Sequence, residues 1–156
     1  MRHTVLDTPL GPLLLVSDGG ALTAATFDET PPPSSRAEPD AILEDATRAL
    51  TAYFEGEPVV FDVPLRLGGT PFQERVWAAL SEIPHGETIS YGTLASRVGT
   101  PLGAQAVGAA NGANPATVIV PCHRVVGADG SLVGYAGGLE RKRALLDVES
   151  RQTSLF

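Results

Sequence analysis

The sequence predicts an α+β chain in two parts, a small sheet-plus-helix domain over residues 1–69 and a mainly helical domain over residues 70–156. Three observations predict this division. Short apolar segments separated by turns fill the first 30 residues, apolar positions at helical spacing follow them, and the pattern becomes mostly helical after Gly68-Gly69. With 43% hydrophobic and 19% charged residues, the chain can bury an ordinary globular core.

The first part begins with three short strands, predicted at residues 3–6, 13–16 and 22–27. Glycine, proline and aspartate turns between them are typical of a small antiparallel sheet. Residues 30–38 are too rich in proline to continue a strand or a helix. From residue 39 to 54, apolar residues recur at helical spacing, which predicts one amphipathic helix that packs against the sheet.

The second part opens with a capped helix. Thr70-Pro71 followed by Glu74 is typical of a helix start, and the helix is expected to run to about Ile83. The last helix is expected over residues 139–149. Between these two helices the sequence predicts several shorter elements.

Two of these elements are short helices, predicted over residues 91–98 and 103–110, with Ser90 as a cap and Gly99 as a stop. Two short helices joined by a glycine-containing turn form a helix-turn-helix, although any compact α-helical domain contains such pairs. The second helix carries almost no side-chain bulk, so it suits close approach to a minor groove or to a neighbouring helix.

Cys122 is the only cysteine, and it follows a β-branched run, residues 118–120, that predicts a buried strand ending at Pro121. A lone cysteine is by default a small buried hydrophobe. If the chain turns at Cys122, the imidazole of His123 can reach the sulfur directly or through a water, and proton removal then generates a reactive thiolate.

An imidazole base works better with a third group behind it. Glu149 lies at the end of the last predicted helix, and from spacing alone it is a solvated helix carboxylate. His3 and His85 have no neighbours that suggest a site, so both are expected to be structural.

The segment 121–127, PCHRVVG, resembles the active-site motif of the O6-alkylguanine-DNA alkyltransferases, also called methylated-DNA–protein-cysteine methyltransferases. The similarity covers residues 70–150 without an obvious gap and extends more loosely to residues 11–13 and 53–54. It implies a ribonuclease H-like first domain and a winged helix-turn-helix-like second domain. The other matching segments are residues 89–92, 106–108, 114–115, 134–138 and 142–149.

The resemblance implies DNA repair with a single turnover. The alkylated guanine, or an O4-alkylthymine, rotates out of the duplex, because sulfur cannot reach an atom inside the base stack. Cys122 takes the alkyl group, His123 contacts it through water, and Glu149 orients His123. This chemistry requires a sulfur that is ionised and exposed at the mouth of a cleft. No cofactor is expected.

Further roles follow from the resemblance alone. Tyr91 would donate a proton to the leaving guanine, and Asn114 would support the cysteine segment. The alternatives are a packing role for Tyr91 and a turn-forming role for Asn114. Val125, Tyr135 and Ala136 would hold the base.

The resemblance places Gln105, Ala106, Gly108 and Arg124 against DNA. The family generally has an arginine where this chain has Gln105, and that arginine replaces the extruded base in the stack. Glutamine lacks the guanidinium charge and its planar stacking surface, so we expect weaker extrusion unless Arg97 or the segment 111–114 contributes.

The net charge of -7 argues at first sight against nucleic acid. The acidity is concentrated in residues 1–70, which hold 4 arginines against 11 acidic residues, whereas residues 71–156 hold 7 basic and 7 acidic residues. The second part can therefore bind double-stranded DNA through a local patch, with salt-sensitive affinity.

The sequence predicts a cytoplasmic protein, because it has neither an apolar run long enough for a membrane nor a signal peptide. No metal site is expected, since the zinc-binding cysteines of some relatives have no counterpart in the first domain. Residues 152–156, QTSLF, resemble the peptides that dock bacterial repair proteins on the sliding clamp, with a disordered tail as the alternative.

Two other functions compete with alkyl transfer. A non-catalytic damage-recognition protein of the same fold carries another residue at the cysteine position, so Cys122 argues against it and Gln105 mildly for it. An unrelated cysteine hydrolase needs an oxyanion hole, and the sequence near Cys122 offers no recognisable loop for one.

Overall fold

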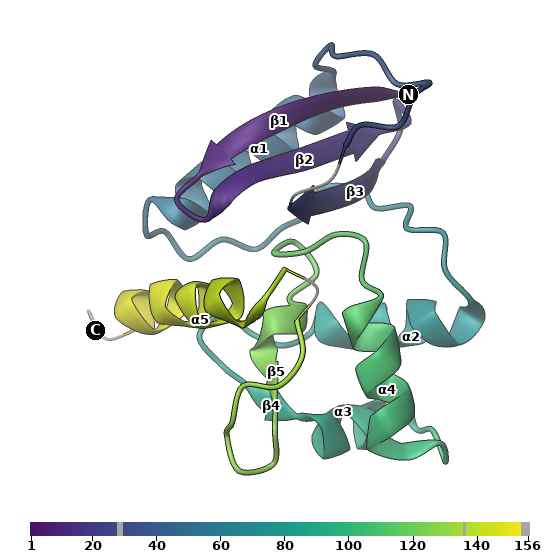
Figure 1. The fold of residues 1–156 in the computed structure, drawn as a ribbon, viewed down its shortest axis with the longest axis vertical. Helices are drawn as coiled ribbons and strands as arrows, with labels where there is room; N and C mark the ends of the chain where they lie inside the picture. The colour runs from purple at the N-terminus through teal and green to yellow at the C-terminus, as the bar shows by residue number, and fades with distance from the viewer. Residues whose placement is uncertain (28–29, 136, 154–156) are drawn as a thin grey trace. The chain divides into compact units, whose positions relative to one another are not determined.

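The computed structural model describes residues 1–27, 30–135 and 137–153 (Figure 1). It divides the chain into two compact units. The first contains Met1–Gly68 and Pro115–Ile119, and the second contains Gly69–Asn114 and Val120–Phe156. A short segment in the second half of the sequence is thus part of the first unit.

The first unit is a three-stranded antiparallel sheet in the order β1-β2-β3, with one helix lying along a face of the sheet (Figure 1). This arrangement confirms the predicted sheet-plus-helix domain. The elements are β1 (Arg2–Thr8), β2 (Gly11–Ser17), β3 (Leu22–Phe27) and α1 (Ala41–Phe54).

The central strand β2 carries the core of this unit. Its residues Leu13, Leu14, Leu15 and Val16 are all at most 4% exposed, and each buried leucine contributes roughly 2 kcal/mol of hydrophobic stabilisation. Asp40 caps α1 by accepting a hydrogen bond from the backbone N–H of Leu43, at 2.8 Å. The buried residues of α1 are Leu43, Ala46, Leu50 and Tyr53.

The second unit is mainly helical, as predicted. Strands β4 and β5 pair in parallel. Helix α2 ends three residues earlier than predicted, and α4 and α5 continue beyond their predicted ends. The elements are α2 (Pro71–Leu80), β4 (Ile89–Ser90), α3 (Tyr91–Val98), α4 (Gly103–Gly112), β5 (Val125–Val126) and α5 (Leu139–Thr153).

Helix caps explain where α2 and α3 begin. Thr70 caps α2 in a capping box, but its partner is Gln73 and not the predicted Glu74, because Pro71 is the first helical residue. Ser90 caps α3 as predicted, and Gly99 ends it in the left-handed conformation at φ 74°.

Small residues allow α4 to pack closely with α2 and α3. The indole Nε1 of Trp77 on α2 donates a hydrogen bond to the carbonyl of Ala110, at 2.9 Å. A Cβ atom added at Gly108 would lie 3.7 Å from the ring of Tyr91. The low bulk of α4 therefore serves packing within this unit.

The strand predicted over residues 118–120 is wrong. Val118 has φ 73°, which is unusual for a β-branched residue, and the segment forms turns. All three residues are nonetheless at most 5% exposed. An apolar β-branched run indicates burial here without indicating strand geometry, and the chain continues into a short 3-10 helix, η1 (Cys122–Arg124).

Candidate active site

Cys122 is the first residue of η1, so the chain does turn at the cysteine. The side chains of Asn111, in the last turn of α4, and of Asn114, two residues after the end of that helix, hold the backbone around it. Asn114 Nδ2 donates to the carbonyl of Val120 at 2.8 Å, and Asn111 Nδ2 donates to the carbonyl of Cys122 at 3.4 Å. Both asparagines are at most 4% exposed, which fixes the place of the cysteine.

The Cys122 residue is 1% exposed, and burial raises the pKa of its thiol to about 11. The side chain of Asn114 and the charge of Lys142 oppose this rise only in part. Cys122 is therefore a protonated thiol at neutral pH. The expectation of an ionised sulfur exposed at the mouth of a cleft is corrected: in this structure the sulfur is neither.

His123, Glu149 and Arg124 form one buried network. His123 Nε2 lies 2.6 Å from Glu149 Oε2. Arg124 donates from Nε to Glu149 Oε1 at 2.8 Å, from Nη2 to Oε2 at 3.2 Å, and from Nη1 to the carbonyl of Ile83 at 2.6 Å. The backbone N–H of Gly86 adds a contact to Oε1 at 3.1 Å.

The network fixes the protonation of its members. Burial by itself would raise the pKa of Glu149, but the bonds from His123 and Arg124 hold that pKa well below its usual range. Burial lowers the pKa of His123 despite the neighbouring carboxylate. Because ionised Glu149 can only accept, His123 donates its Nε2 proton and keeps a lone pair on Nδ1.

That Nδ1 atom is buried without a hydrogen-bond partner among the residues that the structure describes. It lies on the residue next to Cys122. Glu149, at 1% exposure, is not the solvated carboxylate that its spacing indicated.

Tyr91, the first residue of α3, donates its hydroxyl hydrogen to the carbonyl of Val133 at 2.8 Å. Burial and the nearby Cys122 raise the pKa of its phenol, which also interacts with the side chain of Asn111. Tyr91 thus lies within electrostatic reach of the cysteine.

Three residues are predicted to hold the extruded base: Val125, Tyr135 and Ala136. Val125 is fully buried in β5. The hydroxyl of Tyr135 is buried without a partner among the described residues, and burial raises its pKa well above the ordinary value. Ala136 lies outside the described residues.

Gln105, Ala106 and Gly108 all lie on α4, where Gln105 is exposed and the other two are half-buried. The predicted DNA contact of Arg124 is corrected. Its side chain is 7% exposed, and its guanidinium is bonded to Glu149 and to a backbone carbonyl, so it is not available to a phosphate.

Lys142 is a site residue that the sequence analysis missed. It is fully buried, its Nζ donates to the carbonyls of Val133 and Gly134 at 2.9 and 3.1 Å, and it lies 5.8 Å from the centroid of the Tyr91 ring. Burial lowers the pKa of this ammonium group. Helical spacing could have found it, because residues 142, 145 and 149 share one helix face.

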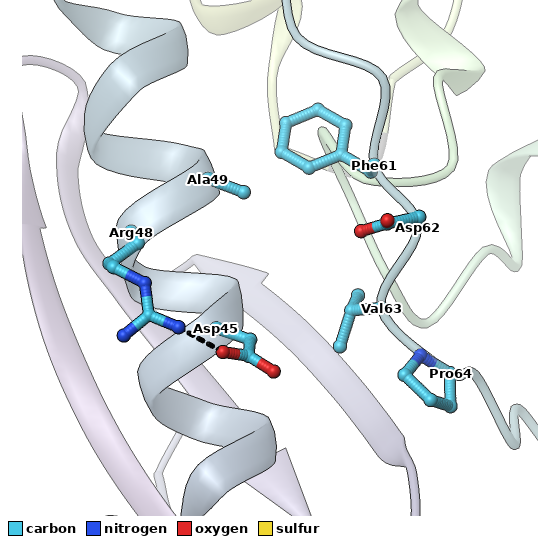
Figure 2. Close-up of a pocket in the computed structure, with 7 residues that line it drawn as sticks. All are labelled: Asp45, Arg48, Ala49, Phe61, Asp62, Val63 and Pro64. Carbon is cyan, nitrogen blue, oxygen red and sulfur yellow. Dashed lines mark hydrogen bonds and ion pairs between the residues drawn. The ribbon is translucent and has the colours of Figure 1, made fainter.

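The first unit contains a separate pocket of about 550 Å³, lined by none of the predicted site residues (Figure 2). Arg48 and Asp45 pair with each other there. The lining residues are Asp45, Arg48, Ala49, Phe61, Asp62, Val63 and Pro64.

His3 is predicted to be structural. Its Nδ1 lies 2.7 Å from the hydroxyl oxygen of Ser35.

Within the described residues, no group of three or more histidine, cysteine, aspartate or glutamate side chains is arranged to hold a metal ion. None of the helices in this part of the chain is long and apolar enough to cross a membrane.

Two family models match the chain. Residues 1–67 match the ribonuclease-like domain of the 6-O-methylguanine DNA methyltransferases, and residues 71–151 match the DNA-binding domain of the same proteins.

Individual relatives agree with these matches. A protein of Mycobacterium tuberculosis named methylated-DNA–protein-cysteine methyltransferase is 51% identical over 152 residues, which cover 96% of this chain and 92% of the relative. A Methanosarcina acetivorans protein of the same name is 46% identical, covering 96% and 98%. The crystal structure of M. tuberculosis OGT in complex with DNA has a TM-score of 0.91 at 49% identity, covering 97% of this chain and 94% of that one.

Proposed function

This chain belongs to the 6-O-methylguanine DNA methyltransferase family, and we propose that it repairs DNA by moving an alkyl group from O6 of guanine onto Cys122. One observation carries the assignment of the acceptor. The relatives are named for methyl transfer to a protein cysteine, and Cys122 is the only cysteine among the 156 residues.

The network behind Cys122 supports a route for the thiol proton. Neutral His123 has a lone pair on Nδ1, and Glu149 can stabilise the imidazolium that forms when this atom takes the proton, directly or through one water. The new thiolate attacks the alkyl carbon, so an S–C bond forms while the C–O6 bond breaks. The thioether product does not hydrolyse, and each molecule acts once.

Tyr91 is proposed to protonate the leaving guanine, which departs more easily as a neutral base than as an anion. Its raised pKa keeps the phenol protonated at neutral pH. The imidazolium of His123 then returns a proton to the tyrosinate, so the proton balance closes.

The bound DNA is proposed to be a duplex with an O6-alkylated guanine, or an O4-alkylated thymine, extruded into a site bounded by Val125, Tyr135 and Ala136. The M. tuberculosis relative has been crystallised with DNA. Gln105, which is exposed on α4, is proposed to enter the space of the extruded base. Ala106 and Gly108 on the same helix allow a close approach to the groove.

Mass spectrometry tests this proposal. After mixing with an oligonucleotide that contains O6-methylguanine, the intact protein should gain one methyl group, located on the Cys122 peptide, and Cys122→Ala should gain none. A wild-type protein that binds this DNA without gaining mass would instead be a non-catalytic damage-recognition protein.

Two further proposals concern where the protein works and which protein it docks on. We propose that the protein works in the cytoplasm, where chromosomal DNA is accessible in a bacterium or archaeon. We also propose that residues 152–156, which follow the motif Gln-x-x-Leu-Phe, dock on a sliding clamp. Their side chains lie outside the described residues. Clamp binding that persists after deletion of these five residues would remove the docking proposal.

A further inference from the structure

Contact with DNA does not explain why the side chain of Arg124 is buried. Its side chain is 7% exposed, and it donates to both carboxylate oxygens of Glu149 through Nε and Nη2. The third contact, from Nη1 to the carbonyl of Ile83 at 2.6 Å, fixes the plane of the guanidinium. Burying such an ion pair costs desolvation free energy, so stability alone is a weak reason for it.

The same carboxylate also contacts His123, at 2.6 Å. A buried carboxylate needs a positive partner. Without Arg124, His123 could serve as that partner in its protonated form, because it lies within hydrogen-bonding distance of the carboxylate. A protonated imidazole has no lone pair and cannot take the proton of a thiol.

We propose that Arg124 is a positioning residue for alkyl transfer: by pairing with both oxygens of Glu149, it leaves His123 neutral, with Nδ1 able to accept the Cys122 proton. This inference rests on the function proposed above and assigns a new role within that site. It also explains why Arg124, two residues after the cysteine, has its charge buried inside the protein.

The groups around His123 agree with this role. Charged neighbours come from α5, which contributes Glu149 and Lys142, and from η1 itself, which contributes Arg124. Lys142 and Arg124 both disfavour a second positive charge on the imidazole, and burial keeps the pKa of His123 below its ordinary value. The thiol of Cys122 completes the titratable groups of η1.

The other elements add little charge. Helix α2 also packs against η1, but its ionisable Glu74 and Arg75 are exposed. The loop that donates Gly86 N–H to Glu149 carries His85, and the loop before α5 carries Tyr135. Arg124 contacts both oxygens of Glu149 as a permanently charged group, whereas the charge of His123 depends on its protonation.

Two substitutions separate charge from shape. Arg124→Lys keeps the positive charge but loses the two-pronged contact, and Arg124→Gln keeps a donor but loses the charge. We measure the single-turnover rate of methyl transfer between pH 5 and pH 9, and we measure the pKa of His123 by NMR titration of the protein without DNA.

For Arg124→Gln we expect the acid limb of the rate profile to move to higher pH by about one unit or more, which means a loss of roughly tenfold below that limb and recovery near pH 9. The NMR pKa of His123 should rise in parallel. Arg124→Lys keeps the charge but not the second contact, so its acid limb should stay near the pH of the wild-type limb while its plateau rate falls.

The double variant Arg124→Gln with Glu149→Gln keeps the test decisive if the single variant does not fold. It removes both buried charges, so the pKa of His123 should return to a low value. For Arg124→Gln, a rate reduced equally at every pH or a His123 pKa equal to that of the wild type would overturn the inference, and so would a raised His123 pKa in the double variant. The NMR titration needs no alkyl transfer, so this outcome differs from failure of the proposed function, in which the wild type gains no methyl group.

Discussion

The two units differ in what they bury. The first unit buries leucine, valine, alanine and aromatic side chains, and none of the aspartate, glutamate, arginine or histidine side chains in its described part is buried. The described part of the second unit buries four residues of the basic and acidic types, His123, Arg124, Lys142 and Glu149, each at most 6% exposed, in addition to the thiol of Cys122. Buried ions are costly unless they are paired. The first unit therefore contributes mainly to stability, whereas the second holds the groups proposed to carry out the chemistry.

Glu149→Gln should have the largest effect, because it leaves Arg124 buried without a counter-ion. We expect a loss of about 3–5 kcal/mol in the free energy of unfolding. Alkyl transfer should fall about 100-fold or more, since His123 loses the charge that stabilises its protonated form. Urea denaturation and single-turnover kinetics measure both quantities.

The matched control is Glu140→Gln on the exposed side of the same helix. It should change the free energy of unfolding by less than about 0.5 kcal/mol. If Glu149→Gln and Glu140→Gln change the unfolding free energy and the transfer rate by similar amounts, the buried network of His123, Arg124 and Glu149 does not set the second unit apart from the first.

Leu15→Ala tests the hydrophobic core of the first unit. Leu15 is fully buried in β2, so its truncation should cost about 2–5 kcal/mol of unfolding free energy. The transfer rate of the folded protein should not change. Val5→Ala, on the half-exposed Val5 of the edge strand β1, is the control and should cost much less. A slower transfer rate in folded Leu15→Ala would show that the first unit also takes part in the chemistry.

The buried thiol predicts a loss of stability at alkaline pH. Because its folded-state pKa is raised to about 11, the unfolded chain releases the thiol proton at a lower pH than the folded chain. Stability therefore falls as pH rises from about 9 to 11, by roughly 3 kcal/mol at most. Cys122→Ser should lack this part of the pH dependence. Identical curves for both proteins would contradict a thiol held neutral by burial.

Gln105→Arg should give the smallest effect, a several-fold faster repair of duplex DNA. Arginine adds the charge and the planar surface that glutamine lacks at the place of the extruded base. The reaction with free O6-benzylguanine needs no extrusion, so its rate should stay the same. Equal acceleration of both substrates would place Gln105 in the chemistry and not in extrusion.

Much of the fold could be predicted from the sequence. The first sheet, α1 and the helices of the second unit follow from hydrophobic periodicity and from caps such as Ser90. The segment 118–120 could not be predicted, since an apolar run indicates burial but not backbone conformation.

The site was less predictable. Family resemblance named Cys122, His123 and Glu149, but spacing alone placed Glu149 in solvent. Arg124 was assigned to DNA because a sequence does not show which charge a guanidinium will meet; its partner lies 25 positions away. Lys142 could have been found from its helix face.

In the proposed reaction, Cys122 is a buried neutral thiol that His123 deprotonates during alkyl transfer. The most direct test compares two pH profiles of the wild-type protein, methyl transfer from O6-methylguanine DNA and alkylation of the same sulfur by iodoacetamide. Methyl transfer should already be near its plateau at neutral pH, whereas the iodoacetamide rate should rise about tenfold per pH unit up to the thiol pKa of about 11. Two profiles that rise together would contradict the account, because they would mean that the free thiolate reacts without help from His123.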